Sequence, residues 1–227
     1  QINETRGLKT KPEQVVVFPG GKPSIGLAQQ VYCEPGDEVI YPSPGFPIYE
    51  SFIRYVRALP VPLHLEESAN FTFSPEQLEN LITPRTKLIY LNFPSNPTGG
   101  VAGKELLDAS AKVILEGCHP NVRVYSDEIY ENIIFDGQQH RSISSVPEME
   151  ERTIIAGGFS KTYAWTGGRI GYAVFPTVKE ADIFKTLNIN YFSCVPPYNQ
   201  EAAKEALENP LSKVAVKEMV ETFEARR

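Results

Sequence analysis

Cysteine is scarce in the 227-residue sequence, and its pattern excludes several classes of protein. The three cysteines, Cys33, Cys118 and Cys194, lie far apart and form no CxxC pair. An odd number of widely spaced cysteines argues against a disulfide framework and against a thiolate metal site. We therefore expect reduced thiols that pack as small apolar side chains in a cytoplasmic protein.

Metal-ligand spacing, basic blocks and long apolar runs are also missing. The three histidines, His64, His119 and His140, show no metal-binding spacing, and we expect ordinary loop or surface residues. The formal charge is −6 without any basic block, so nucleic acid is not an expected partner. No long run lacks polar residues, and the N-terminus lacks a basic and apolar leader pattern, so we expect neither a membrane span nor a secretory signal.

The composition is that of a folded globular chain, with 41 % apolar and 22 % charged residues. The first residue is not Met, and the last residues, 214–227, lie inside a charged helical pattern that has no stop signal. A complete domain rarely stops in mid-helix. We therefore expect this sequence to be a fragment of a longer chain.

Strand and helix patterns alternate along the sequence. Strand patterns cover residues 15–18, 38–41, 59–65, 87–91, 122–125 and 153–156. Helix patterns cover residues 23–33, 48–57, 75–82 and 103–116, the third opened by Ser74 as N-cap and Pro75. This alternation predicts an α/β fold with a mostly parallel sheet covered on both faces. The prolines within 59–65 place that strand near an edge of the sheet.

One connection is too short for this pattern. Only residues 160–169 separate the strand that ends near Phe159 from the apolar run 170–175. A parallel crossover needs about a dozen or more residues, usually with a helix, and this loop also contains two glycines. We therefore expect the run 170–175 to lie antiparallel to the strand before it, with no helix between them.

Four of the expected strands are followed by loops rich in reactive side chains. These loops are Gly20-Gly21-Lys22, residues 92–100, residues 126–130, and Ser160-Lys161 with the later Arg169. Because ligands bind beyond the carboxyl ends of strands in open α/β sheets, we expect the four loops to form one site. A helix N-terminus, a hydroxyl, an arginine, a lysine, an aspartate and a tyrosine suit a phosphorylated ligand that reacts with an amine.

Each of these residues also has an ordinary structural interpretation. Gly20-Gly21-Lys22 is not a Walker A loop and could be a simple turn. Asp127 could belong to a solvated acidic pair with Glu128, although a strand end would bury it and a buried carboxylate needs a cationic partner. Lysines are usually exposed, Arg169 could pair with an acid, and Phe46 could be a core residue.

The ordered combination of motifs carries more information than any one of them. The motifs are Pro44-Gly45-Phe46-Pro47-x-Tyr49, Asn92-x-Pro94-x-Asn96-Pro97-Thr98-Gly99, Asp127-x-x-Tyr130 and Ser160-Lys161 followed by Arg169-x-Gly171. Together they resemble the class I/II aminotransferases, fold-type I enzymes of the aspartate aminotransferase kind that use pyridoxal 5′-phosphate (PLP). The resemblance implies a three-layer PLP-transferase large domain whose mostly parallel sheet has one antiparallel strand.

The resemblance also implies the chemistry and its catalytic residues. It implies transamination between an amino acid and a 2-oxo acid, catalysed by a homodimer through a Schiff base between Lys161 and the PLP aldehyde. Lys161 is then also the proton shuttle, and we expect it to be buried beside Arg169, where desolvation and like charge favour the neutral amine. Asp127 is implied to pair with the pyridine nitrogen and keep the ring an electron acceptor.

The remaining cofactor contacts follow from the same resemblance. Tyr130 and Asn96 are implied to hydrogen-bond the ring hydroxyl, and Phe46 to stack on the ring. The implied phosphate ligands are Ser160, Arg169 and the backbone N–H groups of Gly21 and Lys22. The resemblance further implies a cis peptide bond between Asn96 and Pro97. Tyr49 and residues 193–198 are either pocket-lining or packing residues on the sequence alone.

Two parts of the family pattern have no counterpart in this sequence. Nothing before Gly20 matches the N-terminal arm, and the C-terminal small domain is largely missing. We expect a PLP-binding large domain over residues 1–209 and the start of an interdomain helix over residues 210–227. Three alternatives stay open: a PLP-dependent β-lyase (C–S lyase), a non-enzymatic PLP-sensing regulator, and a natural truncated product that binds PLP weakly.

Overall fold

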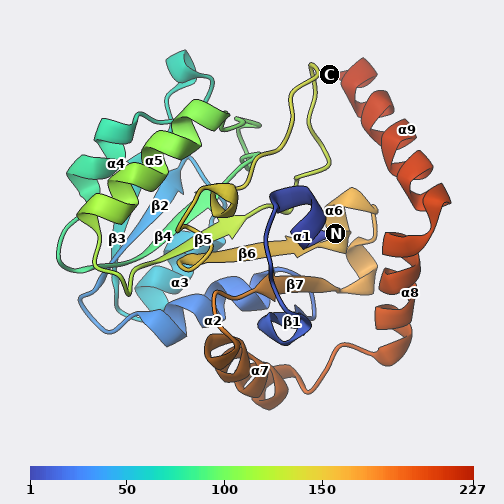
Figure 1. Cartoon of the computed structure of the whole chain (residues 1–227), viewed down its shortest axis with the longest axis horizontal. Coiled ribbons are helices and arrows are strands. Elements are labelled where there is room, and N and C mark those ends of the chain that lie inside the picture. Colours follow the sequence, from blue (N-terminus) through green and yellow to red (C-terminus); the bar gives the residue numbers. More distant parts are fainter.

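The computed structural model describes all 227 residues and contains one seven-stranded sheet (Figure 1). The strand order is β1-β7-β6-β5-β4-β2-β3. The strands are β1 (Val15–Phe18), β2 (Glu38–Ser43), β3 (Leu59–His64), β4 (Thr86–Asn92), β5 (Arg123–Asp127), β6 (Thr153–Gly158) and β7 (Gly171–Val174). The sheet confirms the predicted alternation and places the proline-containing β3 at an edge, as expected.

Strand β7 is the one reversed strand. It pairs antiparallel with β6 on one side and with β1 on the other, whereas β2, β3, β4, β5 and β6 pair in parallel. The prediction of an antiparallel strand after a short connection is therefore confirmed. The expectation that this connection holds no helix was wrong, because the single-turn α6 (Phe159–Thr162) and a 3-10 turn (Thr166–Gly168) fit into it. Both are far shorter than a crossover helix.

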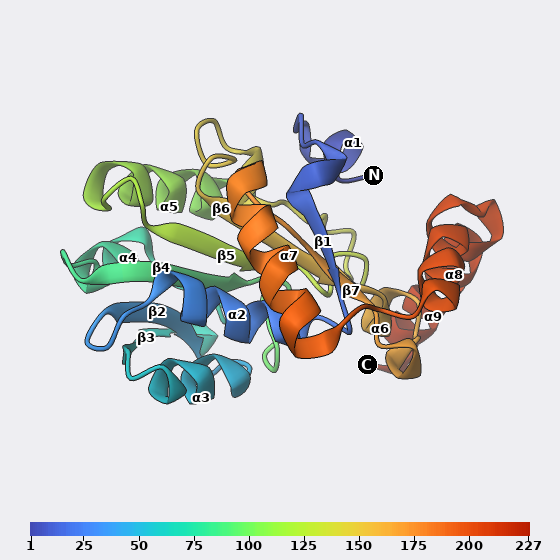
Figure 2. The same cartoon turned by 90° about the horizontal axis from the view of Figure 1, so that it is seen from below.

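Helices cover both faces of the sheet. Helices α2 (Lys22–Tyr32), α3 (Ile48–Tyr55) and α7 (Val178–Phe192) pack on one face, and α4 (Pro75–Leu81) and α5 (Lys104–Gly117) pack on the other (Figures 1 and 2). Side chains alternate along β4 accordingly: Leu88 and Tyr90 join the first core, and Ile89 and Leu91 join the second. This two-sided burial leaves only the ends of the strands free to carry polar chemistry.

Local sequence signals explain where individual helices begin. Ser74 accepts a hydrogen bond from the Gln77 N–H while the Gln77 side chain accepts one from the Ser74 N–H, which completes the capping box of α4. Short 3-10 helices lie at Pro12–Gln14, Glu67–Ala69 and Ile143–Ser145. Helix α1 (Ile2–Arg6) precedes the sheet, and it is tied to the interior by its last residue, the buried Arg6.

The C-terminal helices lie beside the sheet rather than over it. Helices α8 (Pro197–Glu208) and α9 (Pro210–Arg226) form a pair at one end of the molecule (Figure 1). Helix α9 buries none of its residues, and Asn209 caps it by accepting from the Leu211 N–H at 2.9 Å. None of the helices is both long and apolar enough to cross a bilayer.

Candidate active site

A cavity of about 710 Å³ opens at the carboxyl ends of β4, β5 and β6. Its wall contains every residue that the sequence analysis assigned to the cofactor site: Gly21, Lys22, Phe46, Asn96, Asp127, Tyr130, Ser160, Lys161 and Arg169. These residues come from five separate segments of the chain. The structure therefore brings the predicted loops together at one edge of the sheet.

Part of the cavity wall combines a helix N-terminus with a guanidinium, two groups that favour an anion. The chain turns at Gly20, which has φ of 95°, and α2 begins at Lys22, so the first N–H groups of this helix lack helical acceptors. The guanidinium of Arg169 lies directly against Gly20, where an added Cβ would come within 2.2 Å of Arg169 Nη2. Arg169 Nη1 also donates to the Thr166 carbonyl at 2.8 Å. A glycine at position 20 therefore leaves the space in which this cation lies.

The pairing of β1 with β7 brings these two groups together. Phe18, at the end of β1, is the ladder partner of Gly171, at the start of β7. Because β7 is reversed, the residues that precede it reach the same edge of the sheet as the residues that follow β1. Arg169 and the Gly20–Gly21 turn thus meet although they lie far apart in the sequence.

The cavity wall also contains a buried carboxylate without a cationic partner. Asp127 ends β5 and is 8 % exposed. Its hydrogen bonds come from the Tyr49 hydroxyl at 2.7 Å and, at a longer 3.4 Å, from the Ile129 N–H. Burial raises the pKa of Asp127 to about 6, against the opposing effect of the Tyr49 hydrogen bond. Asp127 is buried as expected, and a cation entering the cavity would lower the cost of its charge.

Asn92 joins two parts of the cavity wall, and the sequence analysis did not assign it a role. Its amide nitrogen donates to the Asp127 carbonyl at 3.0 Å, and its Oδ1 accepts from the Asn96 N–H at 2.9 Å. The Asn96–Pro97 peptide bond is cis, which confirms the prediction; Ser43–Pro44 and Phe93–Pro94 are also cis. The position of Asn92 at the end of β4, where it opens the Asn-x-Pro motif, was the signal in the sequence that could have identified it.

Lys161 is one of two lysines in the cavity wall. It belongs to the single turn α6, and its Nζ lies 5.6 Å from the centre of the Tyr130 ring. The other is Lys22, whose Nζ lies 5.7 Å from the centre of the Phe46 ring. The expectation that Lys161 is buried was wrong, because both Lys161 and Arg169 are exposed in the structure.

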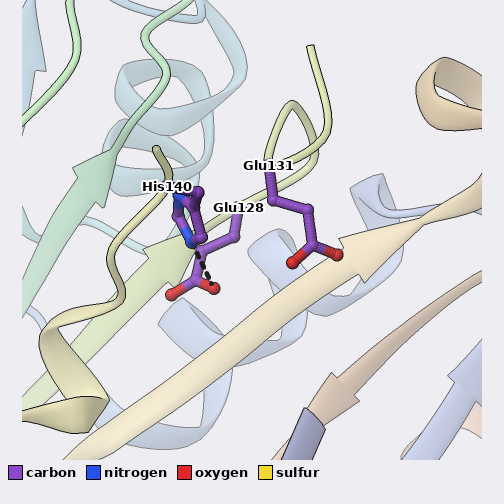
Figure 3. Close-up of side chains that lie close together, drawn as sticks. All are labelled: Glu128, Glu131 and His140. Atoms are coloured by element: carbon purple, nitrogen blue, oxygen red, sulfur yellow. Dashed lines mark hydrogen bonds and ion pairs between the residues drawn. The ribbon is translucent and has the colours of Figure 1, made fainter. Parts of the chain in front are cut away.

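One cysteine differs from its expected setting. Cys194 is exposed, although Cys33 and Cys118 are buried as predicted. His140 is a loop residue, as expected, and its Nε2 also lies 3.0 Å from a buried carboxylate oxygen of Glu128 (Figure 3). The sequence could not show this contact, since it depends on how the loop after β5 folds back.

Tyr49 turns out to be a packing residue rather than a pocket-lining one. It is fully buried, and its ring stacks on that of Tyr90 with centroids 4.7 Å apart. Residues 193–198 do not line the cavity either; Val195 packs with Phe159 in a small apolar cluster. Packing is therefore the alternative observed for Tyr49 and Val195, whereas Ser193, Cys194, Pro197 and Tyr198 are exposed and belong to neither class.

Comparison with known proteins identifies the family to which this arrangement belongs. A family model described as aminotransferase class I and II matches residues 2–227. The chain belongs to this family. Class I and II aminotransferases use PLP, and the cavity fits that group because it joins an anion-binding turn, a primary amine and a buried carboxylate that lacks a cation.

Individual relatives agree with this assignment. The chain is 41 % identical, over 78 % of its length, to a bifunctional aspartate aminotransferase and glutamate/aspartate-prephenate aminotransferase from Petunia hybrida, of which 36 % is covered. It is 37 % identical over its whole length to an aspartate/prephenate aminotransferase from Cereibacter sphaeroides, of which 56 % is covered. Among solved structures, an aromatic aminotransferase from Pyrococcus horikoshii superposes with a TM-score of 0.94 at 30 % identity, covering 99 % of this chain and 60 % of that one. The chain thus spans roughly half the length, or less, of these relatives.

Proposed function

We propose that this protein transfers an amino group from an amino acid to a 2-oxo acid with PLP as cofactor. The observation that carries the proposal is the single cavity that joins the uncompensated carboxylate of Asp127, the amine of Lys161 and the anion-binding turn at Gly21. The names of relatives, which include aspartate and prephenate aminotransferases, support the same reaction class.

The phosphate group would be held at the Gly20 end of the cavity. The ligands there are the N–H groups of Gly21 and Lys22, the hydroxyl of Ser160 and the guanidinium of Arg169. A helix N-terminus and a guanidinium both favour a doubly charged oxyanion, and the N–H groups give it direction. These groups would bind and orient the phosphate, and they would take no part in proton transfer.

The ring would be held between Phe46 and the turn that follows β5. Phe46 lies on the wall in a position to stack on an aromatic ring, and Asn96 and Tyr130 offer an amide and a hydroxyl to a ring oxygen. Asp127 would pair with a protonated ring nitrogen, which supplies the cation that this carboxylate lacks within the chain.

The cofactor supplies an aldehyde that reacts with amines and a ring that accepts electrons from the substrate α-carbon. Lys161 Nζ would hold the aldehyde carbon covalently, with the aldehyde oxygen leaving as water. A substrate amine would displace Nζ from that carbon, and the freed Nζ would then be the base that removes the substrate α-proton and the acid that returns it. Asp127 would keep the proton on the ring nitrogen throughout, because its carboxylate is buried and has no other cation.

We also propose that the working protein is a homodimer. Support comes from an aromatic surface formed by Tyr55, Tyr191 and Phe192, which are 74 %, 60 % and 40 % exposed. They line a second cavity of about 470 Å³ between α2, α3 and the end of α7. Contiguous exposed apolar groups of this kind mark interaction surfaces. Sedimentation of the protein and of Tyr191→Glu tests this, and a monomeric, PLP-saturated, active protein would contradict it.

The domain division and the compartment are further proposals. Residues 1–209 would form the cofactor-binding domain, and residues 210–227 would begin the helix that leads to a second domain. Support comes from the cap at Asn209 and from the greater length of the relatives. Three free cysteines support a reducing compartment, which we propose to be the cytoplasm.

Substrate profiling tests the proposed reaction against its nearest rival. The PLP-loaded protein is mixed with aspartate, aromatic amino acids and a cysteine conjugate, and the products are identified with and without a 2-oxo acid. Transamination gives a new 2-oxo acid and no ammonia, and turnover depends on the added 2-oxo acid. A β-lyase instead gives pyruvate and ammonia from the cysteine conjugate alone, which would overturn the proposal.

A further inference from the structure

The turn that follows β5 has two chemically different sides. On one side, Asp127 and Tyr130 line the cofactor cavity. On the other side, their neighbours Glu128 and Glu131 both accept hydrogen bonds from the guanidinium of Arg6. Arg6 is the last residue of α1, so the first helix of the chain holds the reverse side of the turn that carries two cofactor residues.

The contact between Arg6 and Glu128 is buried and fully satisfied. The two side chains are 3 % and 1 % exposed, and Arg6 Nε and Nη2 lie 2.9 and 2.6 Å from Glu128 Oε2. The other carboxylate oxygen accepts from Ser126 Oγ at 2.8 Å and from Ser142 Oγ. A buried ion pair with this many hydrogen bonds has one strongly preferred geometry.

A metal ion is the obvious alternative occupant, and Arg6 argues against it. Glu128, Glu131 and His140 present their ligand atoms within 4.8 Å of one another. Figure 3 shows the two carboxylates directed to the same side of the turn, with His140 against Glu128. The guanidinium of Arg6 already bonds to both carboxylates and supplies the positive charge that a metal would bring. The cluster of Arg6, Glu128 and Glu131, called the clamp below, is therefore held together without a metal.

We propose that Arg6 is a positioning residue of the cofactor site, which acts through Glu128 and Glu131 to keep Asp127 and Tyr130 facing the cavity. The proposal rests on the function proposed above. Arg6 also screens Asp127 from the negative charge of the adjacent Glu128. The other titratable groups that face this pair are Glu131 on the turn, His140 on the following loop and Tyr172 on β7.

The test compares Arg6→Lys and Arg6→Met with a matched control at Arg123. Arg123, at the start of β5, forms a mostly buried ion pair with Glu180, and neither residue lines the cavity. PLP affinity is measured by absorbance titration across pH. We expect Arg6→Met to weaken affinity about tenfold, as outer-shell losses do, and to move the acid limb of the binding profile to higher pH. Arg6→Lys keeps the positive charge but loses the two N–H donors that share one Glu128 oxygen, so we expect its PLP affinity to lie between those of Arg6→Met and the unaltered protein. Arg123→Met should leave the PLP affinity and its pH profile unchanged.

Hydrogen exchange at the amides of residues 127–131 separates this inference from the proposed function. We expect faster exchange there in both Arg6 variants than in Arg123→Met. If the unaltered protein binds no PLP, the proposed function fails while the exchange data still report on the clamp. If an Arg6 variant folds with unchanged exchange in this turn, or with an unchanged pH profile of PLP binding, the positioning role is overturned. Should Arg6→Met not fold, Arg6→Lys alone decides the question.

Discussion

The hydroxyl of Tyr49 donates a 2.7 Å hydrogen bond to the carboxylate of Asp127 deep inside the protein. Tyr49 keeps its proton, because burial and the negative charge of Asp127 both raise its pKa well above the usual value. The donor in this pair is therefore fixed, and the acceptor is the group that titrates. The hydrogen bond from Tyr49 therefore lowers the pKa of Asp127 and favours its charged form.

Replacing Tyr49 by Phe should weaken PLP binding near neutral pH. Without the hydroxyl, the pKa of Asp127 should rise above about 6, because burial is then opposed by one hydrogen bond fewer. We expect a loss of about 1 kcal/mol in unfolding free energy from the hydrogen bond. Titration with PLP at several pH values measures the first effect. Tyr90→Phe is the control, since its hydroxyl donates to the Ile25 carbonyl instead, and equal effects in both variants would refute the link to Asp127.

Replacing Asp127 by Asn should stabilise the protein without cofactor while weakening PLP binding. A carboxyl group with its pKa raised to about 6 binds its proton more tightly in the folded state than in the unfolded state. The unfolding free energy therefore falls as the pH rises from about 4 to about 6, by about 3 kcal/mol. Asp127→Asn removes this loss, so urea unfolding without PLP should show a higher unfolding free energy for the variant near neutral pH but not near pH 4. If the variant is equally destabilised at both pH values, the raised pKa of Asp127 is contradicted.

Glu128 should give the opposite dependence on pH. Burial alone would raise its pKa, but the hydrogen bond from His140 and the charge of Arg6 hold it at about 2. The folded state thus favours the charged carboxylate, and its stabilisation is complete above about pH 4.5 and lost as the pH falls through about 2. Glu128→Gln should remove about 3 kcal/mol of that acid dependence, as measured by urea midpoints between these limits. If the urea midpoints of Glu128→Gln and of the unaltered protein change in parallel with pH, Glu128 does not titrate in this way.

Two glycine substitutions separate backbone strain from loss of the anion site. Gly20 and Gly36 have φ of 95° and 91°, so Ala at either position should cost about 1–2 kcal/mol of unfolding free energy. Only at Gly20 does the new Cβ collide with Arg169; at Gly36 the space is open. We expect Gly20→Ala to reduce PLP and phosphate affinity and Gly36→Ala to leave both unchanged, as measured by calorimetric titration. Similar affinities for the two variants would mean that Arg169 does not bind the phosphate.

Lys161 should be the residue that carries the cofactor. Borohydride reduction of the PLP-loaded protein followed by peptide mapping should find the pyridoxyl group on Lys161. Lys161→Ala and Lys161→Arg should both lose the covalent link, while PLP still binds reversibly through the phosphate contacts. Lys22→Ala, which alters the other lysine of the cavity, should keep the link. Labelling of Lys22 with Lys161 unmodified would refute the assignment and the roles given to Asp127 and Tyr130.

The fold and the wall of the cavity could be predicted because both depend on signals that are local in the sequence. Apolar runs and turn residues marked each strand, and the length of residues 160–169 alone showed that β7 is reversed. The cofactor residues follow strand ends, where the topology itself brings them together. The ordered motifs then added the chemistry, including the cis bond before Pro97.

The contacts behind the wall could not be predicted, because they join residues that no local pattern relates. Arg6 and Glu128 are 122 positions apart in the sequence, where both look like ordinary charged residues. Tyr49 was recognised as part of a motif, but its bond to Asp127 depends on how α3 packs against the sheet. The exposure of Lys161 depends on what covers the cavity mouth, which is a property of the tertiary structure.

The position of β1 in the sheet has a consequence for how the site comes into being. The first strand of the chain pairs with no strand except the last, with Val15 opposite Val174. During synthesis β1 must therefore wait, unpaired, until nearly all of the sheet has emerged. Closing so long a loop is entropically costly and makes such pairings late events in folding. The anion-binding turn after β1 should accordingly be among the last parts of the molecule to become ordered, so a ligand held there would bind the finished fold and not its precursors.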